Sequence, residues 1–372
     1  MALKKVAVVA TAQAELRPAW RDAQHIDLIS SVVTSVFKGS GFSIDDVDFV
    51  IDSGSDVLDG RSISNCGFLG ALGAHHKEEA RVEEDGLFSA LYGVNKIRSG
   101  AASVGLLVAY SKPSESIVEN YWASQVEPFY QRPVGFNQRA AAGIQAQHYL
   151  AAGKLGARDL AELVVARWAD AMANGGVAID ELPDLDAVLA APEAAAPLTE
   201  LMLARPMDGA VAILIASEDA ARRIGGSPVF VTGMGSSTDC HAYADRDRNR
   251  LRSLEDAAAM SARAAGWDAA SADIAEISSS SVVSELMAIE ALGLAGRGDG
   301  LSAARGGKVA VNRSGGSLPA DPIMATGMFR LAEAVRQLRE PQRYGGGSPS
   351  KAVVTGSVGV AMQSNCVFNL EV

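Results

Sequence analysis

The chain has 372 residues, of which 48% are hydrophobic and 21% charged, and its formal net charge is −11. This length can bury a large core and predicts two fused domains. The acidic balance, with no cluster of lysine and arginine to offset it, argues against a nucleic-acid partner bound through its phosphates. No apolar run is long enough to span a bilayer and the first predicted strand begins almost at once, so we expect a cytoplasmic protein with no membrane partner.

Two segments of the chain follow the same plan. Each begins with a buried-strand run, continues with a helical pattern, and then reaches a glycine and, at the same spacing, an aspartate that opens a second strand. Each copy is expected to end in a short apolar strand. Such a duplication predicts two α/β units with mostly parallel sheets covered by helices. The ranges are 6–10, 26–37, 48–51 and 105–109 in the first copy, and 228–233, 254–265, 273–277 and 352–356 in the second.

An acidic cluster precedes a predicted helix that begins near Leu87. It consists of Glu83, Glu84 and Asp85. A carboxylate at a helix N-terminus is an ordinary cap, because it accepts hydrogen bonds from free backbone N–H groups and favours the positive end of the helix. A catalytic base is the alternative interpretation of the same residues.

The middle of the chain, from about residue 111 to 203, is predicted to be helical with loops. Residues 138–155 and 161–174 carry apolar side chains at helical spacing. The acidic, proline-containing stretch 179–199 is typical of an extended linker. The chain then returns to the core through residues 205–214.

The C-terminal part of the chain, from residue 243 onward, holds most of the candidate site residues. Asn312, Gly315 and Gly316 precede Ala320-Asp321-Pro322, and the whole stretch predicts a strand, a tight loop and a helix. Two tyrosines, Tyr243 and Tyr344, occupy predicted loops, where they could serve as acid–base groups or merely anchor the loops. Four consecutive serines, 278–281, lack the neighbouring histidine that a serine hydrolase needs. The three cysteines have neither paired nor CxxC spacing, so we expect no disulfide framework and no metal site.

These motifs resemble those of the thiolase superfamily, and the likeness is closest to its lipid-transfer-protein-like branch. The frame "N-x-x-G-G…G-H-P-x-x-A-T/S-G" is kept in residues 312–327, with Asp321 at the position of the histidine. The resemblance implies an α/β, thiolase-like fold in which two duplicated α/β halves form a five-layered αβαβα core. It also implies an N-terminal half over residues 1–226, with a helical loop domain inserted at about 111–203, and a C-terminal half over 227–372.

The resemblance also assigns roles to positions, and at each of them the reactive group of the family is missing. The nucleophilic cysteine falls at Glu84 or Asp85, the motif histidine at Asp321, and the second cysteine near Val353. We expect Glu84 or Asp85 at a helix N-terminus near Asp321. The oxyanion and substrate pocket is expected at Asn312, Gly315, Gly316, Gly356 and Ser357. The implied ligand is a coenzyme A thioester, and no cofactor is implied.

Three functions remain open at this point. The first is a catalytically degenerate subunit of a homo- or hetero-oligomer, in which a partner thiolase-like chain supplies the cysteine and the histidine. The second is a cysteine-independent retro-aldolase acting on a β-hydroxyacyl-CoA, with Tyr344, Tyr243 or Asp321 as its acid–base groups and an OB-fold, zinc-containing companion of the DUF35 type. The third, an acetyl-CoA acyltransferase, is disfavoured because the chain lacks the nucleophile, so ordinary thiolase activity is not expected from this chain alone.

Overall fold

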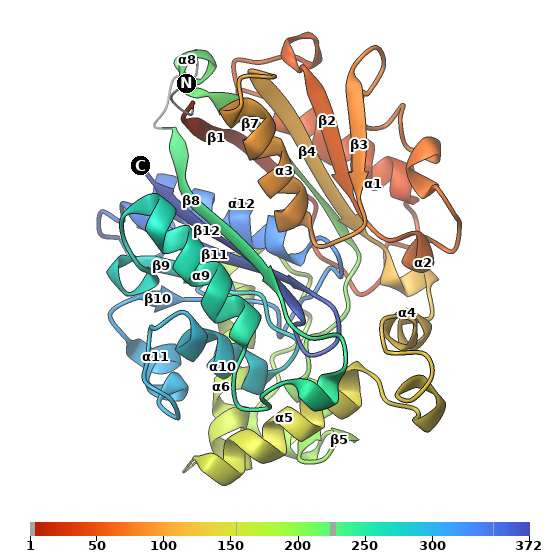
Figure 1. Ribbon diagram of the computed structural model, residues 1–372, viewed down its shortest axis with the longest axis vertical. Helices are drawn as coiled ribbons and strands as arrows, with labels where there is room; N and C mark the ends of the chain where they lie inside the picture. The colour runs from red at the N-terminus through yellow and green to blue at the C-terminus, as the bar shows by residue number, and fades with distance from the viewer. Residues whose placement is uncertain (1–3, 154, 224–227, 345) are drawn as a thin grey trace.

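The computed structural model describes residues 4–153, 155–223, 228–344 and 346–372 (Figure 1). The strands are β1 (Val6–Gln13), β2 (Phe49–Ser53), β3 (Glu78–Val82), β4 (Val104–Ser111), β5 (Glu193–Ala195), β6 (Leu198–Thr199), β7 (Gly209–Ser217), β8 (Val229–Thr238), β9 (Ile274–Glu276), β10 (Ala310–Val311), β11 (Lys351–Val358) and β12 (Ser364–Glu371). The helices are α1 (His25–Val36), α2 (Asp56–Asp59), α3 (Gly86–Arg98), α4 (Val118–Ser124), α5 (Gln138–Ala152), α6 (Ala157–Asn174), α7 (Leu185–Ala190), α8 (Glu218–Ala221), α9 (Arg252–Ala265), α10 (Val282–Ala291), α11 (Gly300–Gly306) and α12 (Thr326–Arg339).

Ten strands form one mixed sheet in the order β10-β9-β11-β12-β8-β1-β7-β4-β2-β3. The strand order repeats. When the five strands of each set are numbered in chain order, both β3-β2-β4-β7-β1 and β10-β9-β11-β12-β8 have the order 3-2-4-5-1. The two sets meet where β1 and β8 pair antiparallel, with Val8 opposite Val229. The predicted repeat of the α/β plan is therefore present in the strand order.

Helices and sheet are stacked in five layers. α1 packs on β1, β4 and β7, and α9 packs on β8 and β12 with α10 beside it. Between the two sets of strands lie α3 and α12, which touch each other and strands of both sets (Figure 1). One core cluster lines this central layer and two others lie under the outer helices. Strands such as β7, whose nine residues are all buried, are continuous apolar runs because both of their faces are covered.

Three sequence expectations are wrong. The sheet is not mostly parallel, because five of its nine strand pairings are antiparallel: β1–β7, β1–β8, β4–β7, β11–β12 and β12–β8. The copies do not end at residues 105–109 and 352–356, because each continues into an antiparallel strand, β7 or β12. β12 contains the polar residues Asn365 and Asn369, which interrupt its apolar pattern. The stretch 179–199 is not an extended linker, since it holds α7 and the β5–β6 hairpin. The expected boundary between residues 226 and 227 lies outside the described residues. None of the described helices is long and apolar enough to cross a membrane.

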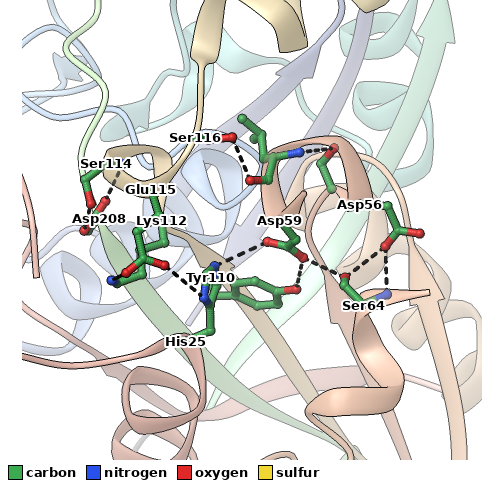
Figure 2. A network of polar contacts seen from close by, with 12 residues as sticks. His25, Asp56, Asp59, Ser64, Tyr110, Lys112, Ser114, Glu115, Ser116 and Asp208 are labelled. Atoms are coloured by element: carbon green, nitrogen blue, oxygen red, sulfur yellow. Dashed lines mark hydrogen bonds and ion pairs between the residues drawn. The ribbon is translucent and has the colours of Figure 1, made fainter. Parts of the chain in front are cut away.

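A buried polar network fastens α1, α2 and the segment before α4 to one another (Figure 2). Asp59 lies at its centre: its carboxylate accepts hydrogen bonds from the hydroxyls of Tyr110 and Ser64, both at 2.6 Å. The Nε2 atom of His25 lies 3.4 Å from the same carboxylate. The Ser116 hydroxyl donates to the Leu58 carbonyl at 2.7 Å. The network thereby fixes the start of α4, a helix that contributes to the pocket described next.

Candidate functional site

A small pocket opens where α4, α5, the turn after β9, the loop before α12 and the end of β11 converge. Its volume is about 80 Å³. Its lining combines aromatic, hydroxyl and amide side chains with one carboxylate. The residues are Tyr121, Trp122, Gln125, Gln138, Arg139, Ala142, Leu203, Ala204, Ser278, Ser279, Ser280, Asp321, Ile323, Met324, Thr326, Ser357, Val358, Gly359 and Met362.

Asp321 is the carboxylate that faces the pocket. Its backbone N–H donates to the Arg205 carbonyl at 2.7 Å, which fixes the loop in place. Its Oδ1 atom accepts a hydrogen bond from the Thr326 hydroxyl. Protein atoms enclose the side chain although part of its surface remains exposed to the pocket. This burial raises the pKa of Asp321 to about 6, against the lowering effects of the Thr326 hydrogen bond and the Arg330 cation. Asp321 can therefore exchange a proton near neutral pH.

Asp85 caps two helices at once. It is the N-cap of α3, where its Oδ1 accepts from the Leu87 N–H at 3.0 Å, and its Oδ2 accepts from the Gly327 N–H at the start of α12, at 2.8 Å. Only 1% of the residue is exposed. Burial raises its pKa to about 7 despite these two hydrogen bonds, and the nearby Asp321 and Glu84 raise it further.

Two glycines make room for the Asp85 carboxylate. A Cβ atom at Gly327 would lie 2.1 Å from Asp85 Oδ1, and one at Gly356 would lie 2.2 Å from the same atom. Neither approach is compatible with a larger residue. Gly356, which we expected in the pocket wall, therefore shapes the site from behind, while its neighbour Ser357 lines the pocket itself.

The acidic cluster before α3 separates into three environments. Glu83 is exposed and pairs with Arg81 at 2.5 Å. Glu84 is half-buried, and this burial raises its pKa. Asp85 is inside. Of the two residues expected at the family's nucleophile position, Asp85 is the one that the structure places at the helix N-terminus close to Asp321.

Tyr121 belongs to the pocket lining, and no pattern in the sequence pointed to it. It is 5% exposed, lines the pocket, and its hydroxyl donates to the Met324 sulfur at 2.9 Å. Burial raises its pKa above the ordinary value, and the carboxylates of Asp321 and Asp85 add to the effect. The hydroxyl therefore stays protonated at neutral pH, and its proton, which is held by the weak acceptor sulfur of Met324, can turn to a stronger acceptor on a ligand. Its helix, α4, has only seven residues and no periodic pattern that would single out a tyrosine.

The serine run lines another side of the pocket. Ser278, Ser279 and Ser280 contribute to the lining, whereas Ser281 caps α10. The Ser279 hydroxyl and the Gln138 amide nitrogen are buried and have no hydrogen-bond partner among the described residues. Buried polar groups normally find partners, so these two are candidates for contact with a bound ligand.

The two tyrosines singled out in the sequence lie elsewhere. Tyr344 precedes β11, whereas Ser357 lies at the far end of that strand, and eight residues of strand span roughly 25 Å. Its hydroxyl donates to Asn174 at 2.9 Å beside a different cavity. Tyr243 packs against Phe136, and its hydroxyl donates to the Ala141 carbonyl at 3.4 Å. The structure does not bring either tyrosine to the lining of the Asp321 pocket.

The remaining positions that we expected at the site make their contacts in the protein core or in loops instead. Val353 is fully buried in the core cluster under α9 and α10. Asn312 accepts from the Ile277 N–H at 2.6 Å and so fixes the strand end before the serines. Gly315 and Gly316 have φ of 98° and 66°, and a Cβ at Gly315 would meet Ala171 of α6 at 2.5 Å. None of these four residues lines the pocket.

Strained backbone surrounds the pocket. Met324 and Met362, both in its lining, have φ of 72° and 55°, and Ala361 has φ of 56°. Non-glycine residues in this region cost free energy and gather at functional sites. This supports a functional role for the pocket.

A thiol lies close to Asp85 but outside the pocket. Cys366 of β12 is fully buried, and its sulfur lies 3.8 Å from the Leu87 carbonyl. Burial raises its pKa well above the ordinary value, and the Asp85 and Glu84 carboxylates raise it further. The thiolate is the nucleophilic form, so this cysteine is held in its unreactive state. Among the residues that the structure describes, no group of three or more His, Cys, Asp or Glu side chains has an arrangement that could hold a metal ion.

The fold and the chain's relatives point to the same class of protein. Residues 235–371 match the family described as "Thiolase C-terminal domain-like". The chain superposes on the Ltp2-ChsH2(DUF35) aldolase with a TM-score of 0.82 and 18% identity, covering 99% of this chain and 97% of that one. Human mitochondrial 3-ketoacyl-CoA thiolase gives a TM-score of 0.75 with 17% identity over 100% and 99% of the two chains. The chain has the thiolase-like fold.

Two curated proteins are similar in sequence. The benzoylsuccinyl-CoA thiolase subunit BbsB of Thauera aromatica is 29% identical over 210 residues, 53% of each protein. The acetyl-CoA acetyltransferase of Methanothermobacter thermautotrophicus is 31% identical over 140 residues, 36% of this chain and 37% of that protein. The chain thus spans about half, or less, of the length of these relatives. With the family match, they support the thiolase superfamily as the family of this chain.

Proposed function

We propose that this chain cleaves a carbon–carbon bond of a β-hydroxyacyl-CoA thioester by a retro-aldol reaction that uses no cysteine. The observation that carries the proposal is the Asp321 carboxylate, which faces the pocket with a pKa of about 6 and lies near the protonated hydroxyl of Tyr121. No thiol belongs to the described lining of this pocket. A general base and a hydrogen-bond donor are what a retro-aldol step requires.

The step proceeds through the side chains of the pocket. The Asp321 carboxylate takes the proton of the β-hydroxyl, the Cα–Cβ bond breaks, and the β-carbon leaves as an aldehyde or ketone. The electron pair of that bond passes to the thioester as an enolate, whose oxygen accepts a hydrogen bond from Tyr121. The proton held by Asp321 then returns to the α-carbon, giving a shortened acyl-CoA and restoring the base. Asp85 contributes by fixing the starts of α3 and α12.

The proposal is tested with β-hydroxyacyl-CoA substrates and the released acyl-CoA as readout. Asp321→Asn should reduce kcat by about a thousandfold or more, within the range that general-base groups contribute. Tyr121→Phe should reduce kcat by about tenfold to a hundredfold, and Tyr344→Phe, in the other cavity, should leave it unchanged. Unaltered turnover in Asp321→Asn would overturn the assignment. A large loss in Tyr344→Phe would move the site to the other cavity.

A degenerate subunit of a heteromeric thiolase is the second candidate. The name of the BbsB relative, which is a thiolase subunit, supports this candidate. A second support is Asp85, which caps both α3 and α12 at the position where the family would carry its nucleophile. Co-expression with a cysteine-bearing thiolase-like chain, or with a DUF35-type companion of the kind present in the aldolase complex, separates the two functions. Cleavage that needs the partner's cysteine identifies a degenerate subunit; cleavage that survives its loss identifies an aldolase. In either case we propose an oligomeric, cytoplasmic protein with halves at 1–226 and 227–372 and a loop domain at about 111–203.

A further inference from the structure

A second cavity of about 230 Å³ adjoins the Asp321 pocket. The two share the side chains of Trp122, Arg139, Leu203 and Ala204, so one wall is common to both. Beyond this wall the second cavity is mainly apolar, and its remaining lining is Trp168, Glu200, Leu201, Arg205, Pro206 and Leu318. A group bound against Asp321 therefore lies next to a second, mainly apolar space whose size suits the rest of an acyl chain.

Arg205 is an unpartnered cation in this apolar space. The residue is half-buried, and its backbone is held on both sides, by the Leu318 carbonyl and by the N–H of Asp321. Its guanidinium carbon lies 5.5 Å from the centre of the Trp168 ring. Among the described residues the guanidinium has no hydrogen bond and no ion pair. Burial lowers its pKa from the ordinary value, and the Asp180 carboxylate, which forms no ion pair with it, offsets only part of this effect.

Two other residues in the lining of this cavity, Arg139 and Trp168, can be compared with Arg205. Arg139, in the shared wall, forms an ion pair with Glu200 and lies 3.8 Å from Glu119, so its charge is balanced. Trp168 is only 6% exposed, and its buried indole N–H also lacks a hydrogen-bond partner among the described residues. Two residues that line the same cavity thus carry N–H donors without acceptors, and the charged one, Arg205, favours an oxygen atom with negative charge.

We propose that Arg205 binds an anionic oxygen group of the ligand, namely a terminal carboxylate on the acyl chain, so that the substrates are CoA thioesters of dicarboxylic acids. The inference rests on the proposed function for the identity of the thioester. Guanidinium and carboxylate match as two parallel hydrogen bonds, and the tryptophans suit the intervening hydrocarbon. A carboxylate fits better than a coenzyme A phosphate, because the Arg205 cavity adjoins the Asp321 pocket, where the proposed function places the reacting acyl end of the thioester.

The test is a binding measurement with hexanoyl-CoA and adipoyl-CoA, which have acyl chains of the same length and differ by a terminal methyl or carboxylate. Quenching of tryptophan fluorescence, checked by calorimetry, gives Kd without any turnover. Wild type should bind adipoyl-CoA about tenfold or more tightly than hexanoyl-CoA. Arg205→Met should remove that preference and leave hexanoyl-CoA binding unchanged, while Arg205→Lys should keep part of it. Arg263→Met, the same change at an exposed position of α9, is the control.

Pantetheine thioesters of the two acids identify the source of the anion, because they lack the phosphates attached to adenosine. If Arg205→Met weakens hexanoyl-CoA and adipoyl-CoA equally, and the loss disappears with the pantetheine thioesters, Arg205 binds a coenzyme A phosphate and the proposal is overturned. Equal binding of both acyl groups by wild type overturns it as well. Failure of the retro-aldol function is distinguishable, since it appears as full turnover in Asp321→Asn and leaves the binding preference untouched.

Discussion

Replacing Asp85 by asparagine should change how stability depends on pH. The pKa of this carboxyl is 3.8 in the unfolded chain and about 7 in the buried site, a difference of about three units. At 1.36 kcal/mol per unit, ionising Asp85 costs the folded state about 4 kcal/mol. Because the folded pKa is the higher one, the folded state holds the proton longer, and its stability falls as pH rises from about 4 to about 7. Between pH 5.5 and pH 8.5 this amounts to about 2 kcal/mol.

The Asp85→Asn variant does not titrate at this position, so it should lack that part of the slope. Its side-chain oxygen can still accept from the Leu87 N–H, but the amide nitrogen would face the Gly327 N–H, which is also a donor. We therefore expect the variant to be less stable than wild type at acidic pH by about 1–3 kcal/mol, the cost of an unsatisfied buried donor. The gap should close as pH rises.

The assay is urea unfolding followed by far-ultraviolet circular dichroism at pH 5.5, 7.0 and 8.5. The quantity of interest is the difference in unfolding free energy between wild type and variant, because other buried carboxylates contribute equally to both slopes. Asp268→Asn makes the same carboxylate-to-amide change at an exposed cap and controls for the substitution itself, because asparagine still caps there. A difference that stays constant across this pH range would refute the conclusion that burial holds Asp85 in its protonated form.

Three further outcomes follow from the contacts described. As a general base of pKa about 6, Asp321 should make kcat/KM rise with pH through about 6 and then level off, whereas a falling profile would assign it the role of an acid. Arg81→Met should lower the unfolding free energy by about 3 kcal/mol, because it leaves the fully buried Asp52, now 2.5 Å from the guanidinium, without its partner; a loss below about 0.5 kcal/mol would contradict this. Gly356→Ala should destabilise the chain by about 1–3 kcal/mol in thermal unfolding, since its Cβ would lie 2.2 Å from Asp85 Oδ1, and wild-type stability would show that α3 can shift freely.

How far the sequence predicts the structure depends on whether the signal is local. The repeated strands were predictable because a strand buried on both faces is a continuous apolar run, as in β7. Asp321 could be singled out through the resemblance, because it stands at the histidine position of a motif whose glycines and prolines lie within a dozen residues. Tyr121 was not, since it reaches the site by contact with Met324, 203 positions away in the sequence. Tyr344 lies close to β11 in the sequence, but at the end of the strand that is far from the pocket. Closeness to a strand in the sequence does not tell which end of that strand forms the site.

The geometry at the start of α3 explains why a base rather than a nucleophile is expected here. The N-terminus of a helix offers free N–H groups and a positive partial charge, which stabilise an anion. In this chain Asp85 takes up that capacity, because its two oxygens accept from both α3 and α12. A thiolate has no place there, and the nearby Cys366 is held as a neutral thiol by its burial beside the same carboxylate. In the described lining of the pocket, Asp321 is the one carboxylate left to move a proton, with Tyr121 as a donor to the developing negative charge. Under the proposed function, bond cleavage at this site therefore begins with proton abstraction by Asp321.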